Sequence, residues 1–240
     1  MNHHSLKNNF LILIFVFFSF QMGNSQNKFS NEELIGKGNP ELFGEGKLRK
    51  EAYTSFEKMK VAAAKDGFKI KIVSGYRNFE RQKGIFERKF TRFTKQGMTG
   101  MEAIRKIIEY STIPGTSRHH WGTDIDIIDD NATYSGDVLV PEKFHGDGPF
   151  CKFREWLEKH ANSFGFYIVY TPESNRKGFK YEPWHYSYAP ISKPMLKVYQ
   201  KIDLIKVLHQ EELKGASYFT DAFIKQYYQE NILDINPELK

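Results

Sequence analysis

Cysteine is almost absent from this sequence of 240 residues, which contains only Cys151. A single cysteine excludes an intramolecular disulfide, because that bond needs two thiols. It also excludes the closed, cysteine-rich ligand sets that are typical of structural zinc sites. Stability must then come from a well-packed core or from a metal held by other side chains. We expect Cys151 itself to be a small buried apolar residue.

A strong charge of one sign is also missing. The formal net charge is +6, and the basic residues are not concentrated in one stretch. This argues against a nucleic-acid-binding protein, whereas mild basicity suits an anionic partner such as a cell-wall polymer. Hydrophobic residues make up 40% and charged residues 27% of the chain. That composition predicts a globular protein with one sizeable domain and extensions, or at most two small domains.

Long apolar runs are lacking after the first 25 residues. The run at residues 10–20 follows Lys7 and precedes the small residues Gly23 and Ser25. This order is typical of a secretory signal peptide, and the run is short for a membrane span. We predict a signal peptide at residues 1–25 and an exported protein, periplasmic or secreted, with no integral span after cleavage. An uncleaved anchor is the alternative.

Helical and strand patterns are mixed without regular alternation, which favours the α+β class. Apolar residues at helical spacing predict helices, and short alternating runs predict strands. The expected helices cover residues 48–65, 79–90, 101–110, 153–161, 195–205 and roughly 216–230. The expected strands cover residues 68–73, 124–128, 166–170 and 181–188, and a long surface loop covers residues 129–149.

Two histidines and an aspartate stand at the ends of expected strands. His119 and Asp126 flank a glycine, which lets the chain turn from a loop into a strand so that both side chains can converge. His185 belongs to a distant strand and would complete the set. Three nitrogen and oxygen donors with one open position are the pattern of a catalytic zinc site. His120 and Asp124 compete as ligands on the same logic.

Two further charged residues suit hydrolysis at such a site. Glu182 precedes His185 by three residues, and Pro183 interrupts strand geometry, so a bend can bring the carboxylate over the metal as a general base. Arg77 follows a strand, where a fixed cation can bind a substrate carboxylate or stabilise an oxyanion. Alone, Arg77 is explained as well by a surface ion pair and His185 by a hydrogen-bonded core residue. Their co-occurrence at strand ends favours the site.

Three linked motifs resemble the VanY/VanX-type zinc D-alanyl-D-alanine carboxypeptidases and dipeptidases. The resemblance covers roughly residues 45–190. It implies a small antiparallel sheet that carries the zinc site and is flanked by helices, as in the D,D-peptidase and hedgehog-like folds. The motif positions are Ser74-Gly75-Tyr76-Arg77 with Gln82, then Ser117, His119, Gly122 and Asp126, and finally Glu182 with His185.

The resemblance assigns roles to these residues. It implies that Glu182 is the general base and that Arg77 meets the substrate or its oxyanion. It implies that Gln82 and Ser117 bind substrate. It further implies one zinc ion per chain, with three ligands that are His119, Asp126 and His185.

The register of the family motif also separates the competing ligands. It favours His119 over His120, and it favours Asp126 because the ligand stands seven residues after the histidine. The sequence departs from the family at Asp124, where the family has alanine. On this register Asp124 is expected to accept a hydrogen bond that orients a ligand histidine.

These expectations define a domain plan and a function. The plan is a signal peptide at 1–25, a lead-in segment at 26–46, a zinc peptidase domain at 47–190 and a C-terminal helical extension at 191–240. The function is that of a monomeric metallocarboxypeptidase that removes a C-terminal D-alanine from peptidoglycan stem peptides, with D,D- and L,D-specificity both open. The alternatives are an endopeptidase of the same family and a non-catalytic cell-wall-binding module.

Overall fold

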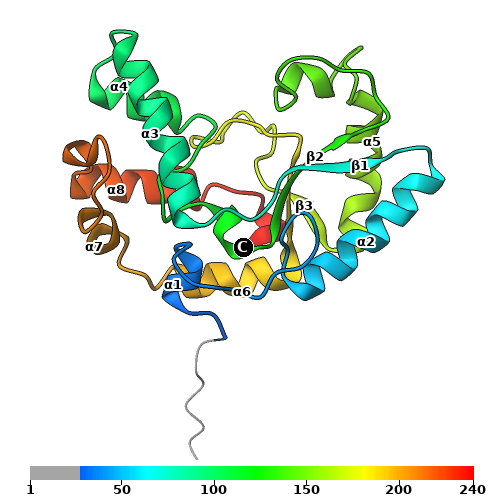
Figure 1. The fold of residues 1–240 in the computed structure, drawn as a ribbon, viewed down its shortest axis with the longest axis horizontal. Helices are drawn as coiled ribbons and strands as arrows, with labels where there is room; N and C mark the ends of the chain where they lie inside the picture. The colour runs from blue at the N-terminus through cyan, green and yellow to red at the C-terminus, as the bar shows by residue number, and fades with distance from the viewer. Residues whose placement is uncertain (1–27) are drawn as a thin grey trace, which may run out of the picture.

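The computed structural model describes residues 28–240. The predicted signal peptide at residues 1–25 lies outside this range. Within it, the α+β prediction is confirmed: four short antiparallel strands form one sheet in the order β1-β2-β4-β3, with helices around it (Figure 1). None of the helices in the described range is long and apolar enough to cross a membrane.

The strands and helices follow the predicted order along the chain. The strands are β1 (Ile70–Ser74), β2 (Asp124–Asp129), β3 (Phe166–Ile168) and β4 (His185–Tyr188). The α-helices are α1 (Asn31–Leu34), α2 (Lys50–Lys65), α3 (Phe79–Lys95), α4 (Gly100–Ile107), α5 (Cys151–His160), α6 (Ala189–Tyr199), α7 (Leu204–His209) and α8 (Asp221–Tyr227). Two short 3-10 helices matter for the site, and they are η1 (Arg118–Trp121) and η2 (Pro141–Phe144).

The central strand β2 is buried along its whole length, and its side chains alternate between two different environments. Ile125 and Ile127 belong to the apolar core that α2 and α5 build on one side of the sheet. Figure 1 shows these two helices together at one side and α3, α4, α7 and α8 gathered at the other. Asp124 and Asp126 point to the second side, where buried carboxylates need partners.

Several predicted boundaries or placements are wrong. The last strand begins at His185 rather than at residue 181, because the chain turns just before it and the His185 amide donates to the Glu182 carbonyl over 3.1 Å. Helix α6 begins at Ala189, so Pro194 lies inside the helix instead of preceding it. Cys151 is half-buried rather than buried, because it occupies the first position of α5 and its thiol faces Glu155 one turn later.

A proline inside α6 removes one backbone hydrogen bond of that helix. The helix nevertheless forms because both sides of the proline are anchored in the core: Ile191, Met195 and Leu196 are buried. The predicted helix at 195–205 is in fact divided, since α6 ends at Tyr199 and α7 starts at Leu204 with Asp203 as its N-cap. The proposed division of the chain between residues 190 and 191 falls inside α6.

The C-terminal helices pack against α1, α3 and α4 in a second apolar core. They also reach back to the segment that precedes η1. The hydroxyl of Tyr199 donates to the Gly115 carbonyl over 2.9 Å. The hydroxyl of Tyr227 accepts from the Ile113 amide over 3.2 Å and lies 2.8 Å from the Thr116 hydroxyl. The C-terminal region therefore supports the backbone next to the site.

Candidate active site

The sheet register brings two of the predicted metal ligands together. Asp126 on β2 and His185 on β4 are direct cross-strand partners, and Ser74 on β1 is the partner of Asp126 on the other side. His119 comes from η1, which ends at Gly122 with a left-handed backbone (φ 68°). This left-handed backbone favours glycine, and a Cβ atom there would also lie 2.7 Å from a methyl carbon of Leu42, which would have to move.

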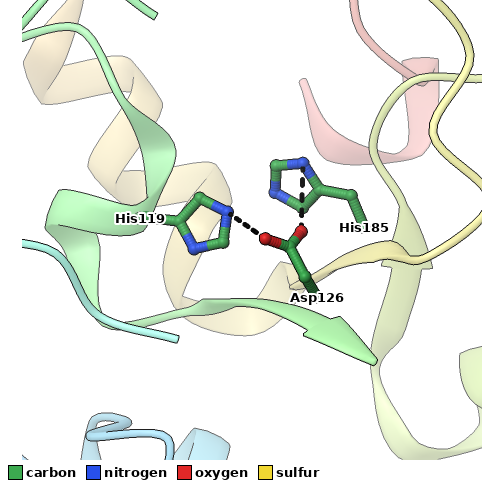
Figure 2. A group of neighbouring side chains, drawn as sticks. All are labelled: His119, Asp126 and His185. Carbon is green, nitrogen blue, oxygen red and sulfur yellow. Dashed lines mark ion pairs between the residues drawn. The ribbon is translucent and has the colours of Figure 1, made fainter. Parts of the chain in front are cut away.

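Asp126 lies between two imidazole rings (Figure 2). One ligand atom from each of His119, Asp126 and His185 can be chosen so that all three lie within 4.8 Å of one another. His119 Nε2 is 3.4 Å from Asp126 Oδ2, and His185 Nδ1 is 4.0 Å from Asp126 Oδ1. Asp126 Oδ1 is buried and has no hydrogen-bond partner among the described residues. A buried, unpaired carboxylate oxygen is costly, and a cation would satisfy it.

The outer hydrogen bonds of the two rings fix which nitrogen faces Asp126. His119 Nδ1 lies 2.9 Å from the Gly75 carbonyl, which can only accept, so this nitrogen carries the proton. His185 Nε2 lies 3.0 Å from Asp124 Oδ2. The inner atoms, Nε2 of His119 and Nδ1 of His185, therefore face Asp126, and His185 Nδ1 also lies 2.9 Å from Glu182 Oε2. Two imidazole nitrogens and a carboxylate, with each ring held by a hydrogen bond on its outer nitrogen, fit a zinc ion.

Asp124 is fully occupied by this orienting role. Its Oδ2 accepts from His185 and from Arg118 Nε at 3.0 Å, and its Oδ1 accepts from the hydroxyls of Thr123 at 2.8 Å and Ser187 at 2.6 Å. Burial alone would raise the pKa of Asp124, but the Arg118 guanidinium and His185 outweigh it and hold that pKa well below its usual range. Asp124 is therefore an ionised acceptor behind the site.

Sequence reasoning did not find Arg118, Thr123 and Ser187. Arg118 is buried, donates to both Asp124 and the Ser187 hydroxyl, and stacks over Trp121 at 4.6 Å. A signal was present for Ser187, because it stands two residues after His185 and so shares its face of β4. No local pattern distinguishes Arg118 from a surface arginine.

Glu182 lies against the cluster, as the predicted bend at Pro183 required. Its Oε2 is 2.9 Å from His185 Nδ1, and the side chain is buried. Burial raises the pKa of Glu182, and the contact with His185 opposes that rise. Burial lowers the pKa of His185, but its hydrogen bonds with Asp124 and Glu182 raise it to about 10. A metal at Nδ1 would compete with the proton held there.

The backbone of Arg77 is held by hydrogen bonds with His119 and His120. Its amide donates to the His119 carbonyl over 3.0 Å, and its carbonyl accepts from His120 Nδ1 over 2.6 Å. The other His120 nitrogen accepts from the Gly115 amide at 3.2 Å. His120 is thus a buried brace between two loops rather than part of the metal cluster. Burial lowers the pKa of Arg77, while Asp126 and Glu182 oppose this.

These side chains line one cleft of about 600 Å³. The cleft brings together the predicted residues Arg77, Ser117, His119, Asp126, Glu182 and His185. Arg77 Nε and Ser117 Oγ are buried there without hydrogen-bond partners among the described residues. Gln82 does not line the cleft: it is buried behind the wall, and its Nε2 donates to the Thr112 carbonyl over 2.8 Å. A direct substrate contact by Gln82 does not match this position.

The chain is similar in sequence to known proteins. The chain is 32% identical over 170 residues to YodJ of Bacillus subtilis (strain 168), provisionally named a carboxypeptidase, covering 70% of this chain and 55% of that protein. It is 29% identical to a D-alanyl-D-alanine carboxypeptidase of Enterococcus faecalis (strain ATCC 700802 / V583), covering 63% and 52%. The chain therefore spans about half the length of the curated relatives it matches.

Two solved structures resemble the fold at 26% identity each. One is a glutamate-to-alanine variant of the vancomycin-resistance D,D-pentapeptidase VanY from a VanB-type cassette, in complex with Zn(II). Its TM-score is 0.51, and the match covers 68% of this chain and 84% of that one. The other is VanYB in complex with D-alanine-D-alanine, with a TM-score of 0.53 and coverage of 73% and 92%.

These relatives and solved structures are named as carboxypeptidases or as D,D-peptidases. The family model for VanY, D-alanyl-D-alanine carboxypeptidase, matches residues 45–191. The chain belongs to the VanY family of D-alanyl-D-alanine carboxypeptidases.

Proposed function

We propose that this protein is a zinc-dependent carboxypeptidase that removes a C-terminal D-alanine from peptidoglycan stem peptides. The observation that carries the proposal is the meeting of His119, Asp126 and His185 with Glu182 in one cleft that also contains the unpaired Nε of Arg77. The likeness to a D,D-pentapeptidase with Zn(II) supports the choice of metal and of substrate class. The leader predicted at residues 1–25 supports export to the periplasm or the exterior.

His119 Nε2, the Asp126 carboxylate and His185 Nδ1 would hold one zinc ion per chain. When bound, zinc polarises a carbonyl oxygen and lowers the pKa of water at the site. Glu182 takes a proton from the water that attacks the scissile carbonyl and returns it to the amine of the departing D-alanine. Its pKa, raised by burial, suits both transfers. The C–N bond breaks, and a shortened peptide and free D-alanine leave.

Arg77 supplies the fixed positive charge of the reaction. Because its backbone is held on both sides by His119 and His120, its guanidinium keeps its place in the cleft. It binds the terminal carboxylate of the substrate or stabilises the oxyanion that forms at the scissile carbonyl. Ser117, whose buried hydroxyl is unpaired, is a further hydrogen-bond donor for the peptide. The first of the two roles of Arg77 is the one that a carboxypeptidase requires, because an endopeptidase cleaves a peptide with no free carboxylate next to the scissile bond.

The decisive experiment replaces the general base. Zinc-loaded Glu182→Ala should fold and keep its metal but lose nearly all release of D-alanine from a synthetic pentapeptide. Glu142→Ala is the matched control, because Glu142 lines the same cleft and, within residues 28–240, forms no ion pair with the three proposed ligands. Hydrolysis at the wild-type rate by Glu182→Ala would refute the mechanism.

Matched substrates separate the remaining alternatives. A pentapeptide with an amidated C-terminus should resist cleavage, and a cross-linked dimer should be cut no faster than a monomer. Cleavage of the dimer and of the amide would assign an endopeptidase instead. Side-by-side penta- and tetrapeptides then distinguish D,D- from L,D-specificity. Binding to isolated cell wall without any release of D-alanine would assign a non-catalytic module.

A further inference from the structure

Lys89 is a cation of the cleft to which the proposed mechanism gives no role. It lies on α3 one turn after Ile85, and both side chains line the cleft. The same cleft is lined by Arg77 and, from the segment around η2, by Asp137 and Glu142. Lys89 therefore adds a second positive charge to the space in which the substrate would lie.

The Lys89 side chain is half-buried, and its ammonium is unpaired. Within residues 28–240 it has neither an ion-pair partner nor a hydrogen bond, whereas the more exposed Lys69 and Lys71 both contact Asp130. Burial lowers the pKa of Lys89, and the nearby Arg77 lowers it further, while Glu182 and Asp137 act in the opposite direction without touching it. A lysine withdrawn from water and left without a partner is unusual, and an anionic ligand would supply the partner.

Arg77 precedes α3 and Lys89 lies in the middle of that helix, so the wall of the cleft carries two cations from different points of the chain, and a substrate with two carboxylates could pair with each. We propose that Lys89 binds a second free carboxylate of the substrate, located on the part of the peptide that precedes the departing residue. This inference rests on the proposed function. It restricts the preferred substrate class to stem peptides that carry a carboxylate in addition to the C-terminal one.

Stem peptides offer that carboxylate from two sources. A glutamate linked through its γ-carbonyl leaves its α-carboxylate free, and a diamino acid such as diaminopimelate carries a carboxylate at the end of its side chain. A plain lysine side chain at the latter position would instead bring an ammonium toward Lys89 and Arg77. Both sources present the same chemistry to Lys89, so the experiment must vary them one at a time.

The experiment uses synthetic pentapeptides in which each of the two carboxylates is free or amidated, with the C-terminus always free. For the wild type, amidating the carboxylate that meets Lys89 should lower kcat/KM by about 10-fold or more, mainly through KM, because a charge-assisted hydrogen bond is lost. Lys89→Met should hydrolyse the peptide with the free second carboxylate more slowly than the wild type does. It should hydrolyse the amidated peptide as the wild type does, so that its rates on the two peptides are equal. Lys83→Met is the control: it removes the same charge from the same helix outside the cleft.

Two results would overturn the inference. The first is the absence of any dependence on the second carboxylate, seen either as equal hydrolysis of all free and amidated peptides by the wild type or as an equal loss on all of them in Lys89→Met. The second is that Asp137→Asn reproduces the effect of Lys89→Met, since Lys89 would then act by pairing with Asp137 across the cleft and not by binding substrate.

Binding titrations keep this inference separate from the proposed function. The same peptides are titrated into zinc-loaded Glu182→Ala protein with Lys89 either intact or replaced by methionine. If the wild type hydrolyses nothing, the proposed function fails. Tighter binding of the carboxylate forms that depends on Lys89 would still support the subsite, and its absence would overturn it.

Discussion

Asp126 and His185 stand directly opposite each other on neighbouring antiparallel strands, and this single pairing organises the site. Directly opposed residues have Cβ atoms roughly 5 Å apart and share one face of the sheet. The next pair along the same face is Asp124 with Ser187. The inner pair therefore contributes two proposed ligands, and the outer pair contributes Asp124, which accepts from His185, and the Ser187 hydroxyl, which donates to Asp124.

Replacing the Asp126 carboxylate should greatly weaken metal binding and leave the fold intact. Asp126→Asn keeps the shape of the side chain but removes the negative charge between the two rings. Zinc affinity should fall by more than the roughly 100-fold that loss of an orienting partner costs. Competition with a chromophoric chelator measures this directly. Asp130→Asn, which removes an equivalent charge next to Lys69 and Lys71, should bind zinc as the wild type does.

Asp124 should affect metal affinity and stability by separate routes. In Asp124→Asn the acceptor for His185 loses its charge, so zinc affinity should fall about 10- to 100-fold. The buried Arg118 would lose its counter-ion, so the metal-free protein should be less stable by about 3–5 kcal/mol in urea unfolding. Adding Arg118→Met should restore much of that stability without restoring the affinity for zinc. Recovery of both together would show that the affinity loss was only a consequence of unfolding.

The sequence alone was sufficient to predict which residues meet in the cluster, but not all of the residues that surround and orient them. Alternation along β2 and the glycine before it were sufficient to place Asp126 near His119, since both are local properties. The approach of Glu182 was also predictable, because a proline beside it cannot continue a strand. The roles of these residues stay predictions until the variants are measured.

Contacts between distant segments could not be predicted in the same way. The pairing of Arg118 with Asp124 depends on a short helix and on a strand register that no local pattern sets. Gln82 is a different case: its place in a motif suggested a substrate contact, whereas its side chain is fully buried outside the cleft lining, with Nε2 bonded to the Thr112 carbonyl. The start of α6 before Pro194 was missed because burial of the helix outweighs its local propensity.

His120 should make the metal-free protein sensitive to acid. Burial lowers its pKa from 6.5 to about 3, although the hydrogen bond to Arg77 opposes this. The folded protein therefore excludes a proton that the unfolded chain binds below pH 6.5, so the contribution of neutral His120 is complete above that pH and is lost as the pH falls toward about 3. The loss is about 2 kcal/mol by about pH 5.

The titration of His120 can be isolated with a side chain that does not titrate. Glutamine can offer a similar donor and acceptor between Arg77 and Gly115. In His120→Gln, the free energy of unfolding in the presence of a chelator should therefore fall less steeply between neutral and acid pH than in the wild type. Urea titrations at several pH values give both slopes. Parallel slopes would mean that His120 is protonated in the folded protein.

Tyr227 should couple the C-terminal helices to the cleft. Tyr227→Phe removes the hydroxyl that accepts from the buried Ile113 amide and pairs with Thr116, and so leaves that amide unsatisfied. Stability should fall by about 1–3 kcal/mol. KM for a pentapeptide should rise while kcat changes little, because Thr112 and Ser117 of the same segment line the cleft. Tyr228→Phe is the matched control, since the hydroxyl of this half-buried neighbour has no hydrogen-bond partner among residues 28–240. Equal effects of the two substitutions, in urea unfolding and in KM, would show that the tail contributes packing alone and does not position the segment that leads into η1.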